Sequence, residues 1–340
     1  MTHRIAIRGT DHVITVRAGQ TILDAALDAA VPYPHGCRSG RCGACKSRLV
    51  RGDVELLQHT PFALSAEERE QGFILACRAV PQQDGEVIWL AEEDDVIVPA
   101  PQRYRGRVVG ISDATHDIKR VSLRLENDEL FPFAAGQYAR LTFPGAPSRD
   151  YSMANLPGQS ELEFHIRHVP RGLTSGRVAS SVRVGDAVLV EGPFGTSYLR
   201  ERHAGPILCV AGGSGLAPIK SIVGSALVAG LRQPIHVYFG VRAERDLYLI
   251  DHFAALGTTH PNVSFTPVLS EPGQATGRRT GWVSDAVAAD LTDLGGWKAY
   301  VAGPPAMVEA TGRVLAERRL RAQDLYADVF FTPELTAAAS

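Results

Sequence analysis

Three cysteines lie close together in the first part of the chain, and a fourth follows further along. Four residues separate Cys37 from Cys42, two residues separate Cys42 from Cys45, and Cys77 is the fourth. Cys-x4-Cys-x2-Cys with a distant fourth cysteine is the ligand spacing of a plant-type 2Fe–2S cluster, in which each iron takes two thiolates. The sequence therefore predicts that these four cysteines bind such a cluster and that the chain carries single electrons.

Glycines and arginines among the cysteines fit the same cluster. Gly36, Gly40 and Gly43 let the backbone approach the irons and sulfides without a Cβ in the way. The cationic Arg38 and Arg41, together with backbone N–H groups, would help to set the reduction potential.

Other uses of these cysteines fit less well. Structural zinc usually takes two close pairs of ligands, and only Cys42 and Cys45 form such a pair. Disulfides need an oxidising compartment, and the start of the chain has no apolar segment typical of a signal peptide. Cysteines buried singly in a core would leave the three glycines unexplained. Cys209 differs from the four, because it lies in the apolar run 207–211 and is expected to be a core thiol.

The composition limits the kind of protein. A length of 340 residues suggests two or three domains. The net charge of −2 argues against a nucleic-acid binder, which would carry a basic stripe. No stretch approaches the roughly 18 consecutive apolar residues of a membrane span. We therefore expect a cytoplasmic protein with no membrane partner.

The first 92 residues have the pattern of a β-grasp ferredoxin, an α+β fold. Residues 4–8 and 12–16 alternate polar and apolar around a short turn, which is typical of a hairpin. Thr21, with Asp24 three residues on, opens a helical pattern. The further elements expected are strands at 47–50, 73–80 and 86–90 and a short helix after Ser65. Residues 93–103 are charged and contain prolines, so we expect a linker there.

The rest of the chain shows two patterns. Short β runs separated by turn residues over 104–203 predict a closed antiparallel barrel of six strands. Strands that alternate with helices over 204–340 predict a doubly wound α/β domain. The elements expected are barrel strands at 107–111, 120–125, 138–143, 161–167 and 187–190 with a helix at 174–182, and α/β strands at 207–211, 235–239, 263–268 and 299–301 with a first helix at 216–227.

Three short sequences stand out in the barrel segment. They are Arg149-Asp150-Tyr151-Ser152, the run from His165 to Ser175, and Glu191-Gly192-Pro193-Phe194-Gly195. In this order, between an iron–sulfur module and a nucleotide fold, they resemble the flavin domain of the ferredoxin–NADP reductase superfamily. The resemblance implies a flavin-binding barrel, and a purely structural barrel is the alternative.

The resemblance also implies a role for each matching residue. Arg149 would pair with a flavin phosphate, Tyr151 would stack on the isoalloxazine ring, and Ser152 would hydrogen-bond near N5, the atom that accepts hydride. Gly172–Ser175 would present N–H groups at a helix start to the pyrophosphate. The other flavin-binding residues implied are His165, Ile166, Arg167, Val169, Leu173 and Thr174. Arg171 is a departure, because relatives often have a second glycine there.

A glycine turn, Gly212-Gly213-Ser214-Gly215, follows the first strand of the α/β segment and precedes a helix. This placement suits a pyrophosphate at the helix N-terminus, although the turn is not the Gly-x-Gly-x-x-Gly fingerprint. The turn, together with Gly303 and Pro304, resembles the pyridine-nucleotide domain of the same superfamily. Relatives usually have a cysteine at the position of Ala302, which leaves the efficiency of hydride transfer open.

The choice between NADH and NADPH depends on the residues after the third strand of this domain. Glu271 would repel a 2′-phosphate and could accept bonds from a ribose diol, which favours NADH. Arg242 and Arg245 lie nearby and favour NADPH. We expect NADH.

The end of the chain, Tyr326–Phe331, resembles the strand that lies against the flavin in the superfamily. The resemblance implies that Phe330 covers the ring and that Asp328 lies near N5. Ser152, Tyr151 and Asp328 are then the candidate catalytic residues. An ordinary edge strand is the alternative.

The whole order of domains is similar to the reductase component of bacterial ring-hydroxylating dioxygenases of the naphthalene and salicylate hydroxylase types. The N-terminal position of the ferredoxin favours FAD over FMN. The resemblance implies a ferredoxin–NAD+ reductase: NADH gives hydride to FAD, and FAD gives single electrons to the cluster. The cluster would then reduce a terminal Rieske oxygenase of aromatic hydrocarbon catabolism, or its ferredoxin. We expect a monomer.

The oxygenase itself must be a separate polypeptide, because this sequence has no Cys-x-His pairs for a Rieske cluster and no evident facial triad for mononuclear iron. Two other functions stay open. The chain could reduce a different terminal enzyme, such as a di-iron monooxygenase or a deoxysugar dehydratase. It could also be a non-catalytic binding or sensor protein that has lost the flavin, but the intact Arg149–Ser152 sequence argues against this.

Overall fold

The computed structural model describes residues 2–89, 99–273 and 275–331, and the chain forms two compact units, Met1–Asp94 and Asp95–Ser340. One buried core belongs to the first unit and two belong to the second. Within the described ranges, no helix is both long enough and apolar enough to cross a membrane.

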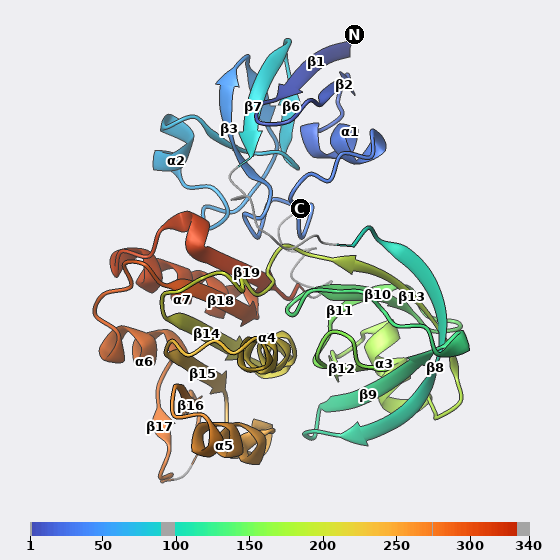
Figure 1. Cartoon of the computed structure of the whole chain (residues 1–340), viewed down its shortest axis with the longest axis vertical. Helices are drawn as coiled ribbons and strands as arrows, with labels where there is room; N and C mark the ends of the chain where they lie inside the picture. The colour runs from blue at the N-terminus through green and yellow to red at the C-terminus, as the bar shows by residue number, and fades with distance from the viewer. Residues whose placement is uncertain (1, 90–98, 274, 332–340) are drawn as a thin grey trace. The chain divides into compact units, whose positions relative to one another are not determined.

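The first unit is a mixed sheet with two short helices (Figure 1). Its strand order is β2-β1-β7-β3-β5, with β1 parallel to β7 and the other neighbours antiparallel. The elements are β1 Thr2–Ile7, β2 Val13–Arg17, α1 Ile22–Asp28, β3 Lys46–Arg51, β4 Val54–Leu56, α2 Ala66–Glu70, β5 Phe73–Leu75, β6 Ala79–Pro81 and β7 Gly85–Trp89. The predicted hairpin, helix and α+β fold are confirmed.

One predicted strand of this unit is wrong in extent. The expected strand at 73–80 is two strands, β5 and β6, and they belong to different sheets. Between them the Arg78 N–H donates to the Leu75 carbonyl oxygen at 2.8 Å, and the Cys77 N–H points at Cys45 Sγ at 3.5 Å. The backbone leaves the ladder here because Cys77 and its N–H are turned toward a sulfur site.

The barrel of the second unit is a six-stranded antiparallel sheet in the order β11-β10-β13-β8-β9-β12. An isolated bridge between Met153 and Phe164 joins its two ends, so the sheet is nearly closed and the predicted barrel is confirmed. Its elements are β8 Gln102–Asp113, β9 Ile118–Leu125, η1 Glu126–Asp128, β10 Tyr138–Thr142, β11 Arg149–Ser152, β12 Glu161–Arg167, α3 Leu173–Ser180 and β13 Ala187–Phe194.

The predicted linker at 93–103 overlaps this barrel. Gln102 and Arg103 pair in β8 with Gly192 and Glu191 of β13. Residues 93–98 of the expected linker lie outside the described residues. The boundaries at 92, 103 and 203 stay predictions.

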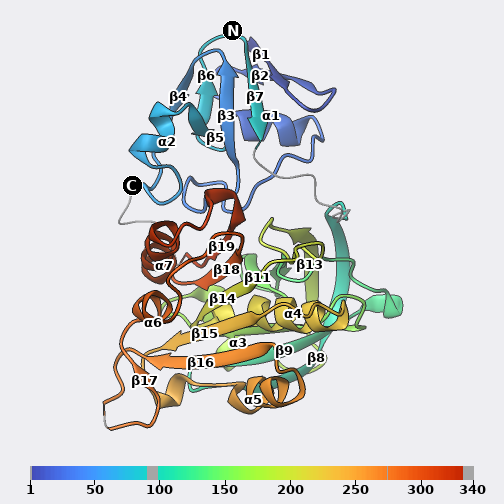
Figure 2. The same ribbon diagram turned by 60° about the vertical axis from the view of Figure 1, so that its left-hand side comes forward.

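The remaining sheet is fully parallel, in the order β17-β16-β15-β14-β18-β19. Helices α4 and α5 cover one face, and α6 and α7 cover the other (Figures 1 and 2). The predicted doubly wound fold is confirmed. The elements are β14 Ile207–Gly212, η2 Gly213–Gly215, α4 Leu216–Val228, β15 Ile235–Val241, η3 Glu244–Asp246, α5 Ile250–Thr259, β16 Val263–Leu269, β17 Arg279–Thr280, α6 Val283–Asp290, β18 Lys298–Gly303, α7 Pro305–Glu317, η4 Ala322–Asp324 and β19 Leu325–Val329.

The strand order of this sheet reverses between β14 and β18. Ligands of open α/β sheets bind outside the carboxyl ends of the strands at such a point. The turn that follows Gly212 and the turn that follows Gly303 leave the sheet side by side at this position.

Thr21 caps helix α1, since its side-chain oxygen accepts a hydrogen bond from the Asp24 N–H at 3.1 Å. Replacing Thr21 by Ala should destabilise α1 by about 1 kcal/mol. Hydrogen exchange of the α1 amides, followed by mass spectrometry, should accelerate about fivefold. Thr21→Ser keeps the oxygen and should exchange like the wild type. Equal rates in Thr21→Ala and the wild type would contradict the capping role.

Candidate functional site

The four cysteines of the first unit form two pairs. Cys37 and Cys42 share a thiol–thiol hydrogen bond, and so do Cys45 and Cys77. Backbone N–H groups point at the sulfurs: those of Ser39 and Arg41 at Cys37 Sγ (3.5 and 3.4 Å), that of Cys37 at Cys42 Sγ (3.4 Å) and that of Cys77 at Cys45 Sγ (3.5 Å). Two pairs of thiols surrounded by N–H donors fit a 2Fe–2S cluster with two ligands to each iron.

Hydrogen bonding separates the thiols by acidity. A hydrogen bond from Cys42, assisted by the N–H groups of Ser39 and Arg41, lowers the pKa of Cys37 to about 5. The hydrogen bonds given to their partners, together with burial, raise the pKa of Cys42 and Cys45 well above the ordinary range. Metal binding needs thiolates, so loading this site releases protons.

Close approach of the backbone is required at Gly40. Its φ is +73°, and an added Cβ would lie 2.7 Å from Arg78 Cγ and 2.9 Å from His59 Cβ. Arg38 also takes a left-handed conformation, and its guanidinium pairs with Asp24 of α1 at 2.7 Å. The loop that carries Cys37, Cys42 and Cys45 therefore packs against the segment after Cys77 and is paired with α1.

Strand β11 brings together the predicted flavin contacts. Ser152 is buried and donates a 2.7 Å hydrogen bond from Oγ to Oδ2 of Asp328 on β19. Arg149 is exposed, and Tyr151, two residues on, shares its face of the strand. The Arg149 guanidinium also bonds its neighbour's carbonyl, that of Ser148, at 2.7 Å. Two residues that the sequence assigned to one flavin atom, Ser152 and Asp328, thus touch each other across the two domains.

The carboxyl group of Asp328 has unusual acidity. Burial raises its pKa to about 6, while the hydrogen bond from Ser152 acts in the opposite direction. Burial also raises the pKa of Tyr151 to about 12, so its hydroxyl stays protonated. A carboxyl group with a pKa near neutrality can both hold and release a proton.

The start of helix α3 offers backbone donors. The first bond of the helix runs from the Gly176 N–H to the Gly172 carbonyl, so the N–H groups of Leu173, Thr174 and Ser175 precede the helical ladder. The Ser175 hydroxyl accepts from the Val169 N–H at 3.1 Å and shapes the turn before the helix. The donors at this helix start suit a phosphate group.

Two further side chains fix the same turn. The Thr174 hydroxyl donates to the Pro147 carbonyl at 2.6 Å. Arg171 has a φ of +60°, a conformation that glycine takes readily. Arg171 therefore holds a backbone conformation that suits glycine, at a conformational cost of about 1 kcal/mol.

The glycine turn of the α/β domain packs tightly against the end of β18. An added Cβ on Gly215 would lie 2.1 Å from the Ala302 carbonyl oxygen, and one on Gly212 would lie 2.5 Å from Met307 Sδ. The Gly303 carbonyl accepts from the Phe330 N–H at 2.9 Å, which ties the end of β19 to the same place. Gly212–Gly215, Gly303 and Pro304 therefore lie together at the carboxyl ends of β14 and β18.

Cation–π contacts and hydrogen bonds hold strand β19 in place. The buried Arg200 guanidinium lies 3.6 Å from the ring centre of Tyr198 and 4.4 Å from that of Tyr326. Lys298 Nζ bonds the Tyr326 hydroxyl at 2.8 Å and Asp324 at 3.1 Å. Since Tyr326 precedes Asp328 on the same strand, these contacts fix the position of the Asp328 carboxyl group.

Arg242 and Glu271 are neighbours at the carboxyl edge of the sheet. The Glu271 N–H donates to the Arg242 carbonyl at 2.7 Å, and both side chains are exposed. One exposed carboxylate and one exposed guanidinium thus belong to neighbouring residues at this edge.

The predicted flavin contacts on β12 have other partners. Ile166 lies in the barrel core. His165 is buried, with Nε2 2.8 Å from Glu163 and Nδ1 3.0 Å from the Tyr248 hydroxyl. Arg167 donates to Asp117 at 2.7 Å. The structure therefore directs His165 to the α/β domain.

Sequence reasoning missed Glu163, Lys220 and Tyr248. Lys220 of α4 donates to Glu163 at 2.6 Å, and Tyr248 contacts the glycine turn. The period-two alternation of β12 was the available signal, because it places Glu163 on the same face as His165.

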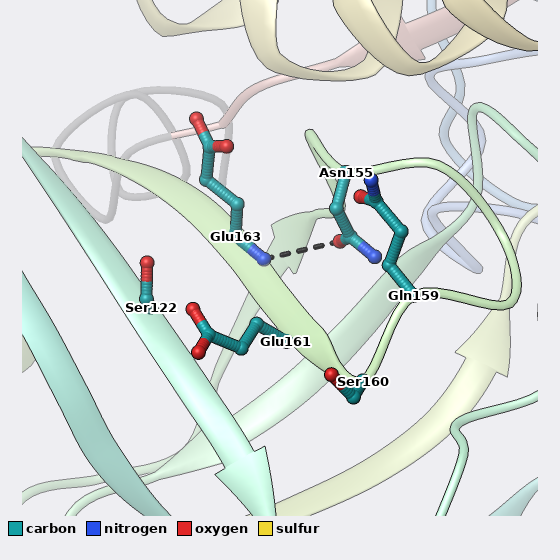
Figure 3. Close-up of a pocket in the computed structure, with 6 residues that line it drawn as sticks. All are labelled: Ser122, Asn155, Gln159, Ser160, Glu161 and Glu163. Carbon is teal, nitrogen blue, oxygen red and sulfur yellow. Dashed lines mark hydrogen bonds between the residues drawn. The ribbon is translucent and has the colours of Figure 1, made fainter.

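A polar hollow of about 390 Å³ lies beside this contact, lined by Ser122, Asn155, Gln159, Ser160, Glu161 and Glu163. The Glu163 N–H donates to Asn155 Oδ1 at 3.0 Å (Figure 3). None of the six lining residues is a predicted cofactor contact, and its two acidic residues make it unsuited to the phosphates of FAD or NADH.

Comparison with known proteins agrees with this geometry. Residues 5–82 match the 2Fe-2S iron-sulfur cluster binding domain, residues 105–198 the oxidoreductase FAD-binding domain and residues 209–313 the oxidoreductase NAD-binding domain. The chain is 40% identical to the ferredoxin–NAD(P)+ reductase component of the naphthalene 1,2-dioxygenase and salicylate 5-hydroxylase systems of Ralstonia sp, over 94% of this chain and 95% of that relative. The chain belongs to the family of ferredoxin–NAD(P)+ reductase components.

Two other proteins are similar over nearly all of this chain. The reductase component of phenol 2-monooxygenase from Pseudomonas sp. strain CF600 is 36% identical over 98% of this chain and 95% of that protein. The crystal structure of the Amycolatopsis cytochrome P450 reductase superposes with a TM-score of 0.75 at 35% identity and covers all of both chains. The reductase is thus an oxidoreductase with 2Fe–2S, FAD and NAD domains, as predicted.

Gly215 should be essential for nucleotide binding in the reductase. Gly215→Ala places a methyl group against the Ala302 carbonyl and should push the turn away from β18. We expect the KM for NADH to rise tenfold or more while the FAD content is unchanged. Gly257→Ala, whose Cβ would make an ordinary 3.4 Å contact on α5, is the matched control. An unaltered KM in Gly215→Ala would refute this role of the turn.

Asp328 should make stability depend on pH. Because its folded pKa of about 6 exceeds the ordinary aspartate value, the folded state binds more protons between these two values. The free energy of unfolding therefore falls as pH rises from about 4 to about 6. Asp328→Asn should remove this fall and be more stable at pH 8 by about 1 to 2 kcal/mol, a discounted figure because the side chain keeps some solvent contact.

Urea unfolding at about pH 5 and about pH 8 measures this difference. Asp251→Asn, which changes an exposed aspartate of α5 that is not among the groups acting on Asp328, is the control and should keep the wild-type pH profile. A parallel pH profile for Asp328→Asn and the wild type would show that Asp328 does not carry the proton.

Proposed function

We propose that this chain takes two electrons from NADH and delivers them one at a time to a terminal Rieske oxygenase that hydroxylates an aromatic ring, or to that oxygenase's ferredoxin. One observation carries the proposal. A single chain holds the paired cysteines of an electron carrier, a glycine turn at the reversal point of its α/β sheet and, on the edge strand β19 next to β18, the Ser152–Asp328 contact.

Different residues would bind different parts of the two nucleotide cofactors. Arg149 and the first N–H groups of α3 would hold the flavin phosphates, and the Tyr151 ring would lie against the flavin. The turn Gly212–Gly215 would hold the pyrophosphate of NADH. When bound, the cofactors supply the redox chemistry: hydride transfer between nicotinamide and flavin, and single-electron transfer at the cluster.

Ser152 and Asp328 would bind and transfer a proton at the flavin. Asp328 Oδ2 can hold a proton near neutral pH, and the Ser152 hydroxyl is in contact with it at 2.7 Å. A hydroxyl group both donates and accepts, so Ser152 can pass a proton between Asp328 and a group bound beside β11.

Glu271 supports NADH as the donor. The bond between its N–H and the Arg242 carbonyl keeps the carboxylate at the carboxyl edge of the sheet. A carboxylate there would repel a 2′-phosphate, whereas the guanidinium of Arg242 would attract one. We propose NADH because the Glu271 carboxylate is exposed at this edge.

The identity of the acceptor rests on the relatives. The relative that serves naphthalene and salicylate systems is 40% identical, against 36% for the phenol monooxygenase component and 35% for the cytochrome P450 reductase. This order favours a Rieske oxygenase. A di-iron or P450 monooxygenase is the second candidate, with the same internal electron path.

An anaerobic titration with NADH, and separately with NADPH, tests the electron path. We expect NADH to bleach the flavin absorbance, a reduced-cluster EPR signal to follow, and about three electrons to be taken up, two by flavin and one by the cluster. In the Cys77→Ser variant, NADH should still bleach the flavin absorbance, but the reduced-cluster EPR signal should be absent. Cys209→Ser, which changes a buried core thiol on β14, is the control and should behave like the wild type.

Three results would count against the proposal. Bleaching without an EPR signal in the wild type would contradict the cluster, and equal reduction by NADPH would contradict the role of Glu271. No reduction by either nucleotide would favour the non-catalytic binding protein.

A further inference from the structure

Alternate residues of β12 face the α/β domain. Glu163, His165 and Arg167 lie on this face, and each contacts the other domain: Glu163 at Lys220, His165 at Tyr248, and Arg167 beside Gly213, whose added Cβ would lie 3.4 Å from the guanidinium. The opposite face of the strand, buried in the barrel core, consists of Leu162, Phe164 and Ile166. The barrel thus contacts the α/β domain, including the turn Gly212–Gly215, through one face of β12.

Tyr248 stands between this face and the turn. Its hydroxyl oxygen lies 3.0 Å from His165 Nδ1 and 3.3 Å from the Gly213 carbonyl oxygen. Tyr248 is only 6% exposed, and its ring packs edge-on against His165 and Phe239. A phenolic hydroxyl has one hydrogen, so it cannot donate to both partners.

The protonation state of His165 decides between the two partners. Nε2 faces the Glu163 carboxylate at 2.8 Å and carries a hydrogen in either state. In the neutral ring Nδ1 is an acceptor and takes the hydrogen of Tyr248. In the imidazolium ring Nδ1 donates to Tyr248, and the hydroxyl hydrogen is then available to the Gly213 carbonyl.

Charged groups face His165 from several elements. Besides Glu163 on its own strand and Tyr248, they are Arg120 on β9 and Lys220 on α4. His252 on α5 faces the same three groups, Lys220, Glu163 and Arg120. Burial, together with the positive charges of Lys220 and Arg120, lowers the pKa of His165, although Glu163 acts against this. The change of state is therefore expected below the ordinary histidine value of about 6.5.

We infer that Tyr248 is a positioning residue for the pyrophosphate of NADH, and that protonation of His165 turns its hydroxyl toward Gly213 and tightens nucleotide binding. The inference rests on the proposed function, because NADH is the nucleotide concerned. A fixed Gly213 carbonyl holds the turn in the shape that directs its N–H groups at a phosphate.

The test is a calorimetric titration with ADP-ribose, which carries the pyrophosphate but no nicotinamide. The full chain, loaded with FAD and cluster, is titrated at about pH 8 and at the lowest pH at which circular dichroism shows it folded. The wild-type Kd should be about two- to tenfold larger at the higher pH, the effect of one hydrogen bond. Tyr248→Phe should have the weaker Kd at both pH values. It should also raise the KM for NADH at the lower pH without changing kcat.

Tyr238→Phe is the matched control. It removes the same hydroxyl from a buried tyrosine of β15, where the bond goes to Asp290 at 2.9 Å, and should keep the wild-type pH profile. A loss of stability alone would affect both variants, whereas the pH dependence of Kd should vanish only in Tyr248→Phe.

Two results would overturn the inference. One is a pH-independent Kd in the wild type, which can be measured whether or not Tyr248→Phe folds. The other is a pH dependence that persists in Tyr248→Phe, as expected if it comes from another group such as the exposed His116 beside Asp246. If ADP-ribose binds with the expected profile but NADH does not reduce the flavin, the proposed function fails and the positioning role stands.

Discussion

One carboxylate joins the barrel to the α/β domain of the second unit. Glu163 accepts hydrogen bonds from His165 on its own strand, Arg120 on β9 and Lys220 on α4. Burial alone would raise the pKa of Glu163, but His165 and Lys220 hold it well below its ordinary value. A carboxylate removed from water is tolerated only with several such donors. The contact therefore specifies one arrangement of the two domains.

The position of the Ser152–Asp328 contact follows from that arrangement. Lys220 belongs to the helix that continues the glycine turn, and Glu163 belongs to the strand next to the bridge at Met153. Fixing these two elements brings β19 to β11, where Ser152 meets Asp328. The stacking of Arg200 on Tyr326 supports the same strand from the other side. The chemistry of one proton thus depends on contacts made well away from it.

The sequence predicted what local spacing can specify. Cysteine spacing, period-two strands and the glycine turn before α4 each depend on neighbours in the chain, and they located the cluster, the barrel and the nucleotide fold. The break of the strand at 73–80 was missed because a ligand requirement at Cys77 overrides β propensity. The direction of His165 was missed for a different reason. Alternation shows that it faces away from Phe164, but only the folded chain shows that Tyr248 and Lys220 lie opposite.

The separate core of the first unit has a consequence for how the protein is made. That core includes Cys45 and Cys77, and it is built only from residues that precede the flavin barrel in the chain. A ribosome adds about 5–20 residues per second, and domains fold as units in order of synthesis. The ferredoxin unit can therefore be folded and ready for iron and sulfide roughly ten to fifty seconds before β19 is available to complete the flavin site. Cluster insertion can therefore precede the completion of the second unit.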